Sequence, residues 1–194
     1  QNYWNIKNPV AAIKEGIAYY TDGWADMNAA LTELAADADI ILTGTTYQEV
    51  AANVAERYGI PMAALHYFPA RPNSHLLPVP LPTWLIKPGF AVGEWALWRL
   101  GKSAEDEQRR TLGLRATNVR SAKRIVEAGA LEIQAYDKEL FPGLAERWGD
   151  RRPLTGALTL QLDAPTDATT SEWMNAGTAP IYFGFGSTPV ESPA

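Results

Sequence analysis

The sequence predicts an α/β protein in which a parallel sheet is flanked by helices. Residues 39–68 carry this prediction, because two apolar runs there enclose a segment with helical spacing. The composition agrees with a folded chain, since 46% of the 194 residues are hydrophobic and 20% are charged. That length suits one sizeable domain, or a domain with the first piece of another.

A long helix is expected near the amino terminus. Asn8 and Pro9 are favourable residues for a helix start, and apolar residues then recur every three or four positions. The stripe comprises Val10, Ile13, Ile17, Tyr20, Trp24, Met27, Leu31 and Leu34. We expect it to face the core, with a bend at Gly16 or Gly23.

A strand, a helix and a second strand follow. Asp39 to Gly44 is a short β-branched and apolar run, as expected of a buried parallel strand. Residues 47–58 have apolar side chains at helical spacing, and Gly59 stands where a glycine ends many helices. Ile60 to Phe68 then supplies the second strand, joined by a right-handed crossover.

Six prolines between Pro69 and Pro88 predict a long loop, because proline disfavours helices and central strands. This loop leaves the carboxyl end of a parallel strand, where open α/β sheets place their ligands. Residues 90–114 are predicted to form one or two helices, in which the run EDEQRR is a solvated face.

The basic stretch 109–124 is interpreted as solvated surface, with binding to an anionic ligand or a membrane as the alternative. Further strands are expected in residues 130–137 and 152–160. Residues 167–177 are predicted to be a polar linker that contains a short helix.

Composition excludes several functions. Cysteine is absent, which rules out disulfides, thiolate metal sites and a cysteine nucleophile. The net charge of -5 makes nucleic acid an unsuitable partner. Apolar runs are too short for a membrane span, so we expect a soluble, cytoplasmic protein. The two histidines, His66 and His75, do not have the spacing of a tight metal site, and we expect no metal.

Few side chains in this sequence indicate chemistry. His66 is either a packed strand histidine bonded to backbone or a donor or base in a cleft. His75 is expected to be exposed, with ligand contact as the alternative. Asp137 and Glu139 could act as paired carboxylates, although acids near a strand end usually cap the next turn.

A glycine-rich turn is predicted near the carboxyl end. Ala179 to Phe185 has the pattern of an apolar strand that runs into Gly184, Gly186 and Ser187. Glycines there allow close approach, so backbone N–H groups and the Ser187 hydroxyl could face a phosphate. A plain turn at a strand end is the alternative.

Three segments together resemble the bacterial glycosyltransferases of family one, in the branch that glycosylates glycopeptide antibiotics, glycolipids and sterols. They are ADIILTGTTYQEVAANVAERYGIPMAALHYFPARPN, RRPLTGALTL and PIYFGFGSTP, and the resemblance covers nearly all of residues 30–190. It implies a GT-B fold, in which two Rossmann-like domains face each other across a cleft. The amino-terminal domain holds the acceptor, and the carboxy-terminal domain holds a nucleotide sugar.

The resemblance also implies a division of the chain. Residues 1–165 would be part of the acceptor domain, residues 166–178 a linker, and residues 179–194 the first strand and loop of the donor domain. The strand that carries the general base is expected upstream of Gln1, so no catalytic base is assigned. The rest of the donor lobe is expected downstream of Ala194, and the chain alone would then be incomplete and inactive.

The implied chemistry is that of an inverting hexosyltransferase. It would move a sugar from a UDP- or dTDP-sugar to a hydroxyl of an apolar acceptor, without a metal or other cofactor. Residues implied on the donor side are Gly184, Gly186 and Ser187. Residues implied on the acceptor side are His66, Arg71, Asn73, His75 and Trp84.

Two other interpretations stay open at the level of sequence. In the first, the domain is a binding module that holds an apolar ligand or partner and catalyses nothing. In the second, which is compatible with either function, Trp84, Trp95, Trp98 and the basic stretch make peripheral contact with the inner face of a membrane.

Overall fold

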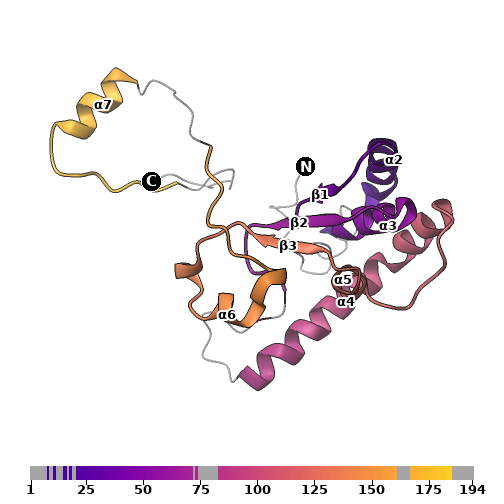
Figure 1. Cartoon of the computed structure of the whole chain (residues 1–194). Helices are drawn as coiled ribbons and strands as arrows, with labels where there is room; N and C mark the ends of the chain where they lie inside the picture. The colour runs from indigo at the N-terminus through magenta and orange to yellow at the C-terminus, as the bar shows by residue number, and fades with distance from the viewer. Residues whose placement is uncertain are drawn as a thin grey trace. The chain divides into compact units, whose positions relative to one another are not determined.

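The computed structural model describes residues 21–71, 73, 83–160 and 167–184, together with residues 8, 11, 15, 16 and 18. The chain divides into two compact units, Lys7–Leu158 on one hand and Gln1–Ile6 with Thr159–Ala194 on the other. In its described part, the larger unit is an α/β domain with a three-stranded parallel sheet flanked by helices (Figure 1).

The sheet confirms the predicted strand, helix and strand unit. β1 (Ile41–Thr43) leads through α3 (Gln48–Tyr58) to β2 (Met62–His66), and β3 (Leu131–Gln134) pairs with the other side of β2. All pairings are parallel, so the carboxyl ends of the strands meet at one edge. Gly59 ends α3 with a φ of 67°, as predicted, and this left-handed conformation favours glycine.

Small side chains build the core between the sheet and its helices. α2 (Trp24–Ala35) lies against α3, and α5 (Ser121–Glu127) lies on the other side of α3. The buried cluster comprises Ala35, Ile41, Ala51, Val54, Ala55, Met62, Leu112, Ile125 and Ala130. Four of the nine residues of the buried cluster are alanine, and such small side chains allow neighbouring helices to approach closely.

The first predicted helix is only partly confirmed. Helical residues lie on both sides of a turn at Gly23, where a bend was expected, and Trp24 is buried. A Cβ atom added at Gly23 would lie 2.8 Å from the Tyr47 hydroxyl, so glycine permits this close approach. Leu34 contradicts the predicted stripe, because it is 73% exposed. The other members before residue 21 lie outside the described residues.

α4 (Thr83–Thr111) corrects the extent of the proline loop. The prediction that prolines exclude a helix as far as Pro88 is wrong, because Pro88 lies inside α4. A proline in this position removes one backbone hydrogen bond of the helix, and the 29-residue length of α4 leaves the rest of the ladder intact. Residues 90–114 were predicted to be helical, and residues 90–111 are.

The run EDEQRR in α4 is only partly solvated. Its interpretation as a solvated face is wrong for Glu105, Gln108 and Arg109, whereas Glu107 and Arg110 are exposed as expected. Glu105, Gln108 and Arg109 are at most 3% exposed. Gln108 Oε1 accepts hydrogen bonds from Trp24 Nε1 at 3.0 Å and from Asn53 Nδ2 at 2.8 Å. The Gln108 amide in turn donates to the side chain of Asn28 at 2.9 Å and to a backbone carbonyl of α3 at 3.0 Å.

The charged side chains between α3, α4 and α5 form ion pairs. Arg109 forms a two-point contact with the Glu56 carboxylate at 2.7 and 2.9 Å, and this hydrogen bonding holds the pKa of Glu56 below its usual value. Arg124 pairs with buried Glu105 and also donates to Asn53 at 3.0 Å. The solvated interpretation of the basic stretch is therefore wrong for Arg109 and Arg124.

Residues after β3 form short helical turns. They are η2 (Lys138–Leu140), α6 (Leu144–Trp148) and η3 (Gly149–Arg151). The strand predicted within residues 130–137 is confirmed as β3, whereas residues 152–160 form only an isolated parallel bridge between Leu154 and Gln134. The prediction of a second strand there is wrong, because the chain leaves the sheet after that one residue.

The smaller unit contains the predicted short helix, α7 (Ala168–Asn175). Asp167 caps it by accepting a hydrogen bond from the Thr170 backbone N–H at 2.9 Å. Residues 179–184 are irregular, so the strand expected there is not formed within the described residues. Tyr182 and Phe183 are 91% and 78% exposed, and no described strand of this unit offers them a partner.

Replacement of Gln108 by leucine tests the buried network. The substitution keeps the volume but leaves the N–H groups of Trp24 and Asn53 without their acceptor, so we expect it to lower the free energy of unfolding by about 2–3 kcal/mol. Urea denaturation measures this change. Glu107→Gln is the neighbouring control, because the pair of Glu107 with Arg110 is exposed and its loss should lower the free energy of unfolding far less than Gln108→Leu does. Equal stability of the two variants would contradict the assigned network.

Candidate functional site

Polar side chains gather at the carboxyl edge of the sheet, where β1, β2 and β3 end. The loop after β1 reaches Tyr47, which has a φ of 59° and is thus in the left-handed region that non-glycine residues rarely adopt. The following residue, Gln48, donates a hydrogen bond to the Thr45 carbonyl at 2.9 Å. Strained residues cluster at ligand sites, which supports a site at this edge.

Glu132 is the centre of this cluster. It lies on β3 opposite Ala64 of β2 and is 2% exposed. Its two oxygens accept hydrogen bonds from Nε of Arg71 and Nε of Arg152, each at 2.5 Å. Arg71 also donates to Gln48 Oε1 at 3.2 Å. One carboxylate thereby joins the loops that follow all three strands.

The charge of Glu132 depends on these partners. Burial raises the pKa of the carboxyl, but the charges and hydrogen bonds of Arg71 and Arg152 outweigh burial and hold that pKa below its usual value. Glu132 is therefore an anion near neutral pH, and its single negative charge is shared by the two guanidinium groups.

His66 lies next to this carboxylate as a neutral imidazole. It ends β2, is fully buried, and has Nε2 4.0 Å from Glu132 Oε1. Burial lowers the pKa of His66 to about 4; Glu132 opposes this effect, and Arg71 and Arg152 add to it. Neither ring nitrogen has a hydrogen-bond partner among the described residues. The predicted packed strand position is correct, but the expected bond to backbone is not formed there.

Gln134 and Tyr136 extend the cluster along β3. The Tyr136 hydroxyl donates to Gln134 Oε1 at 2.7 Å, and Gln134 Nε2 donates to the Glu132 carbonyl at 2.8 Å. Burial raises the pKa of Tyr136, so its hydroxyl stays protonated. Asp137, just beyond, accepts a hydrogen bond from the Ala157 backbone N–H at 3.1 Å, which ties the next loop to the edge.

The structure brings three of the predicted acceptor-side residues to one edge. His66 and Arg71 both lie against Glu132. Asn73 is fully buried and donates to the carbonyls of Pro69 at 2.9 Å and Arg71 at 2.7 Å, so it closes the turn that carries Arg71.

The remaining predicted residues lie outside the described residues or in the smaller unit. His75, Gly186 and Ser187 lie outside the described residues, as does the side chain of Trp84. Gly184 belongs to the smaller unit and is exposed. Sequence reasoning missed Glu132 and Arg152. The sequence held only part of the signal. Glu132 and Gln134 alternate with apolar residues and so lie on one face of a strand, but alternation alone does not say whether that face is buried.

A pocket of about 520 Å³ opens at the opposite, amino-terminal edge of the sheet. Its walls come from the ends of α3 and α5 and from the residues that lead into β2 and β3, chiefly alanine, glycine, Ile60, Met62 and Ile125. It does not include any residue of the Glu132 cluster. We place the candidate site at the carboxyl edge, because the polar chemistry is there.

No helix of the described residues is long and apolar enough to cross a membrane. No group of three or more His, Asp or Glu side chains in the same residues could hold a metal ion.

Fold and site together define an α/β domain with a polar cluster at the ligand-binding edge of a parallel sheet. The whole chain is 48% identical over 194 residues to a *Mycobacterium tuberculosis* protein named an uncharacterized glycosyltransferase, and 49% identical over 196 residues to a *Mycobacterium leprae* protein named likewise. A *Mycobacterium bovis* relative named only as an uncharacterized protein is 45% identical over 196 residues. No family model matches the chain. The chain spans about half the length of these curated relatives, 45–47%.

The buried imidazole predicts a dependence of stability on pH. The unfolded chain binds a proton at His66 near pH 6.5, whereas the folded protein does so near pH 4. Neutral His66 therefore contributes fully to the free energy of unfolding above pH 6.5. As the pH falls from 6.5 to 4, the free energy of unfolding decreases by about 3 kcal/mol because of this residue. Urea unfolding of the wild type and of His66→Phe should show that the variant lacks this part of the decline. Parallel pH profiles for both proteins would contradict the assignment.

Proposed function

We propose that the protein is a glycosyltransferase and that this chain supplies most of its acceptor-binding half. The observation that carries the proposal is 48–49% identity across the whole chain to relatives named as glycosyltransferases. The parallel sheet and its polar carboxyl edge support it, since α/β domains bind ligands at that edge. The resemblance to family one adds a GT-B fold and a nucleotide sugar, such as a UDP- or dTDP-sugar, as donor.

The acceptor in this proposal is an apolar molecule that carries a hydroxyl group. Tyr67 and Phe68 directly follow β2 and are 60% and 49% exposed, so the loop offers aromatic surface beside the Glu132 cluster. Arg71 is held by Glu132 and Gln48. Asn73 fixes the turn from Pro69 to Asn73 that carries Arg71. We propose that these residues, with His66 beneath them, form the acceptor side of the site.

The proposed reaction is inverting transfer without a metal. A general base, which we do not assign to any residue of this chain, takes the proton of the acceptor hydroxyl as its oxygen attacks the anomeric carbon. The bond to the nucleoside diphosphate breaks, and the diphosphate leaves toward backbone N–H groups. Gly184, Gly186 and Ser187 are the proposed donor-side residues of this chain.

Titration of the full-length protein with nucleotide sugars tests the function. We expect calorimetry to detect binding of a UDP- or dTDP-sugar, and mass spectrometry to detect a glycosylated acceptor when hydroxylated lipids and sterols are supplied. Activity should persist after treatment with EDTA. Binding of apolar acceptors with no affinity for any nucleotide sugar would instead identify a non-catalytic binding module.

Substitution at Arg71 separates the two halves of the proposed site. We expect Arg71→Gln to raise KM for the acceptor about tenfold, because the turn at Asn73 loses its anchor to Glu132, and to leave the Kd for the nucleotide sugar unchanged. Arg110→Gln is the matched control, since Arg110 is exposed and pairs only with Glu107 among the described residues. A rise in the donor Kd with no change in acceptor KM would contradict the assignment of this edge to the acceptor.

A further inference from the structure

The middle segment of α4, residues 92–105, turns three polar side chains toward the protein. Glu94 lies 3.4 Å from a guanidinium nitrogen of Arg120 and 3.8 Å from one of Arg71. One turn further along, Trp98 donates its indole N–H to buried Glu105 at 3.0 Å. Because Glu94, Trp98 and Glu105 recur at helical spacing, they define one face of α4, and this face is directed inward.

The opposite face of this segment is apolar and exposed. Val92, Trp95 and Leu100 are 64%, 52% and 44% exposed, and Leu97, at the margin of this face, is 69% exposed. Val92 and Trp95 are three residues apart and Leu100 follows Val92 by two turns, so all three lie on one side of α4. Beside them, a Cβ atom added at Gly93 would meet no atom within 4 Å. Figure 1 shows α4 extending away from the sheet toward its amino-terminal end.

This arrangement inverts the usual pattern of a surface helix, which buries its apolar stripe and exposes its polar one. A soluble surface rarely carries such a face without a function. The exposed face also carries a positive charge and no negative charge within residues 91–103. Arg99 lies between Trp95 and Leu100, is exposed, and has no ion pair among the described residues. The one carboxylate of residues 91–103, Glu94, is on the inward face.

We propose that this face of α4 lies in the interface of a lipid bilayer. Val92 and Leu100 enter the boundary of the acyl chains, and the amphipathic ring of Trp95 sits at the level of the headgroups. Arg99 then meets a lipid phosphate, which a helix with an acidic outer face could not do. A purely apolar protein partner would leave this cation buried and unpaired, so a surface that combines acyl chains with phosphates fits best.

This proposal differs from the membrane contact that the sequence suggested. Trp98 faces inward. Five of the six cations of the basic stretch are paired with carboxylates, namely Arg109, Arg110, Arg120, Lys123 and Arg124, which leaves the exposed Arg115 without an ion pair among the described residues. Binding is therefore driven mainly by insertion of apolar side chains rather than by a basic patch. The proposal does not rest on glycosyl transfer, because it concerns a face that none of the proposed site residues occupies.

Sedimentation of the full-length protein with lipid vesicles tests the proposal. We expect the protein to sediment with phosphatidylcholine vesicles and to bind more tightly when phosphatidylglycerol is added. Replacement of Trp95 and Leu100 together by serine should weaken binding at least tenfold, because two inserted side chains are lost. Arg99→Gln should weaken binding to the phosphatidylglycerol vesicles by about fivefold.

The matched control replaces one tryptophan and one leucine by serine outside α4. Trp173 and Leu34 are exposed and lie outside α4, and their joint replacement by serine should leave vesicle binding unchanged. Wild-type protein that stays in the supernatant with both vesicles would overturn the proposal, and so would equal loss of binding in the control. Wild-type oligomers in gel filtration that the Trp95 and Leu100 variant lacks would also overturn it, because a second copy would then cover this face.

Discussion

The buried carboxylate of Glu132 is the constraint on which the carboxyl edge of this domain depends. A charge in the middle of a sheet is costly unless it is paired and hydrogen-bonded. Arg71 and Arg152 meet that need, but they belong to separate loops, so each loop must lie over the edge of the sheet. Arg71 adds Gln48 at the start of α3 to the same group. The geometry of the site is thus fixed by electrostatics more than by apolar packing.

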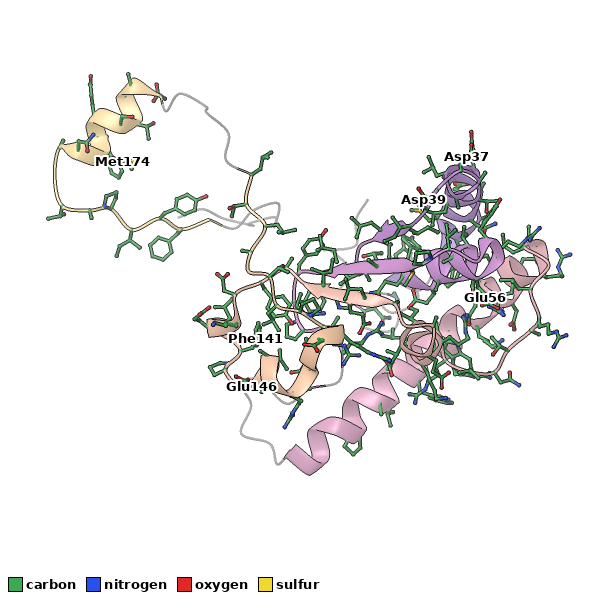
Figure 2. All side chains as sticks on the ribbon, in the orientation of Figure 1. Asp37, Asp39, Glu56, Phe141, Glu146 and Met174 are labelled. Atoms are coloured by element: carbon green, nitrogen blue, oxygen red, sulfur yellow. The ribbon has the colours of Figure 1, made fainter. Side chains whose placement is uncertain are left out.

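Buried polar groups that must be paired also fix the arrangement of the helices α2, α3, α4 and α5. The core around these helices is rich in alanine, and small side chains let helices approach closely without specifying one orientation. Gln108 and Arg109 supply that specification, because their hydrogen bonds reach Trp24 on α2 and Asn53 and Glu56 on α3. Glu56 is labelled in Figure 2. Each bond is directional, so the three helices α2, α3 and α4 have few alternative arrangements in which every buried polar group is satisfied.

Local patterns were enough to predict the strand, helix and strand unit, because its signals are short in range. Apolar runs, helical spacing and Gly59 each act within a few residues. The same reasoning failed for EDEQRR, since charges spaced by four residues fit a solvated helix and a buried one equally well. What decides between them is the partners, and Asn53 and Glu56 lie more than 50 residues before Arg109. The prediction from Pro88 was wrong for a similar reason. A proline costs the helix one backbone hydrogen bond, and the other hydrogen bonds of a 29-residue helix remain.

Sequence analysis predicted residues at the carboxyl edge of the sheet, but it did not predict Glu132, the residue at the centre of the polar cluster there. The loop after β2 was predicted to carry Arg71 and Asn73, and both lie at the carboxyl edge. Glu132 was missed because one acid within a strand is also compatible with an exposed position, and only the register of β3 against β2 shows that it is buried. Cross-strand neighbours come from distant parts of the chain, so no local pattern contains them.

The two faces of α4 connect these features. Its inward face carries Glu94, which contacts the same Arg71 that Glu132 holds at the proposed acceptor side. Its outward face carries Val92 and Trp95. A helix that rests on lipid through one face and on the acceptor loop through the other would keep that loop near the membrane surface. An apolar acceptor dissolved in the bilayer would then need to move only a short way to reach the carboxyl edge, which gives the inverted polarity of this helix a physical purpose.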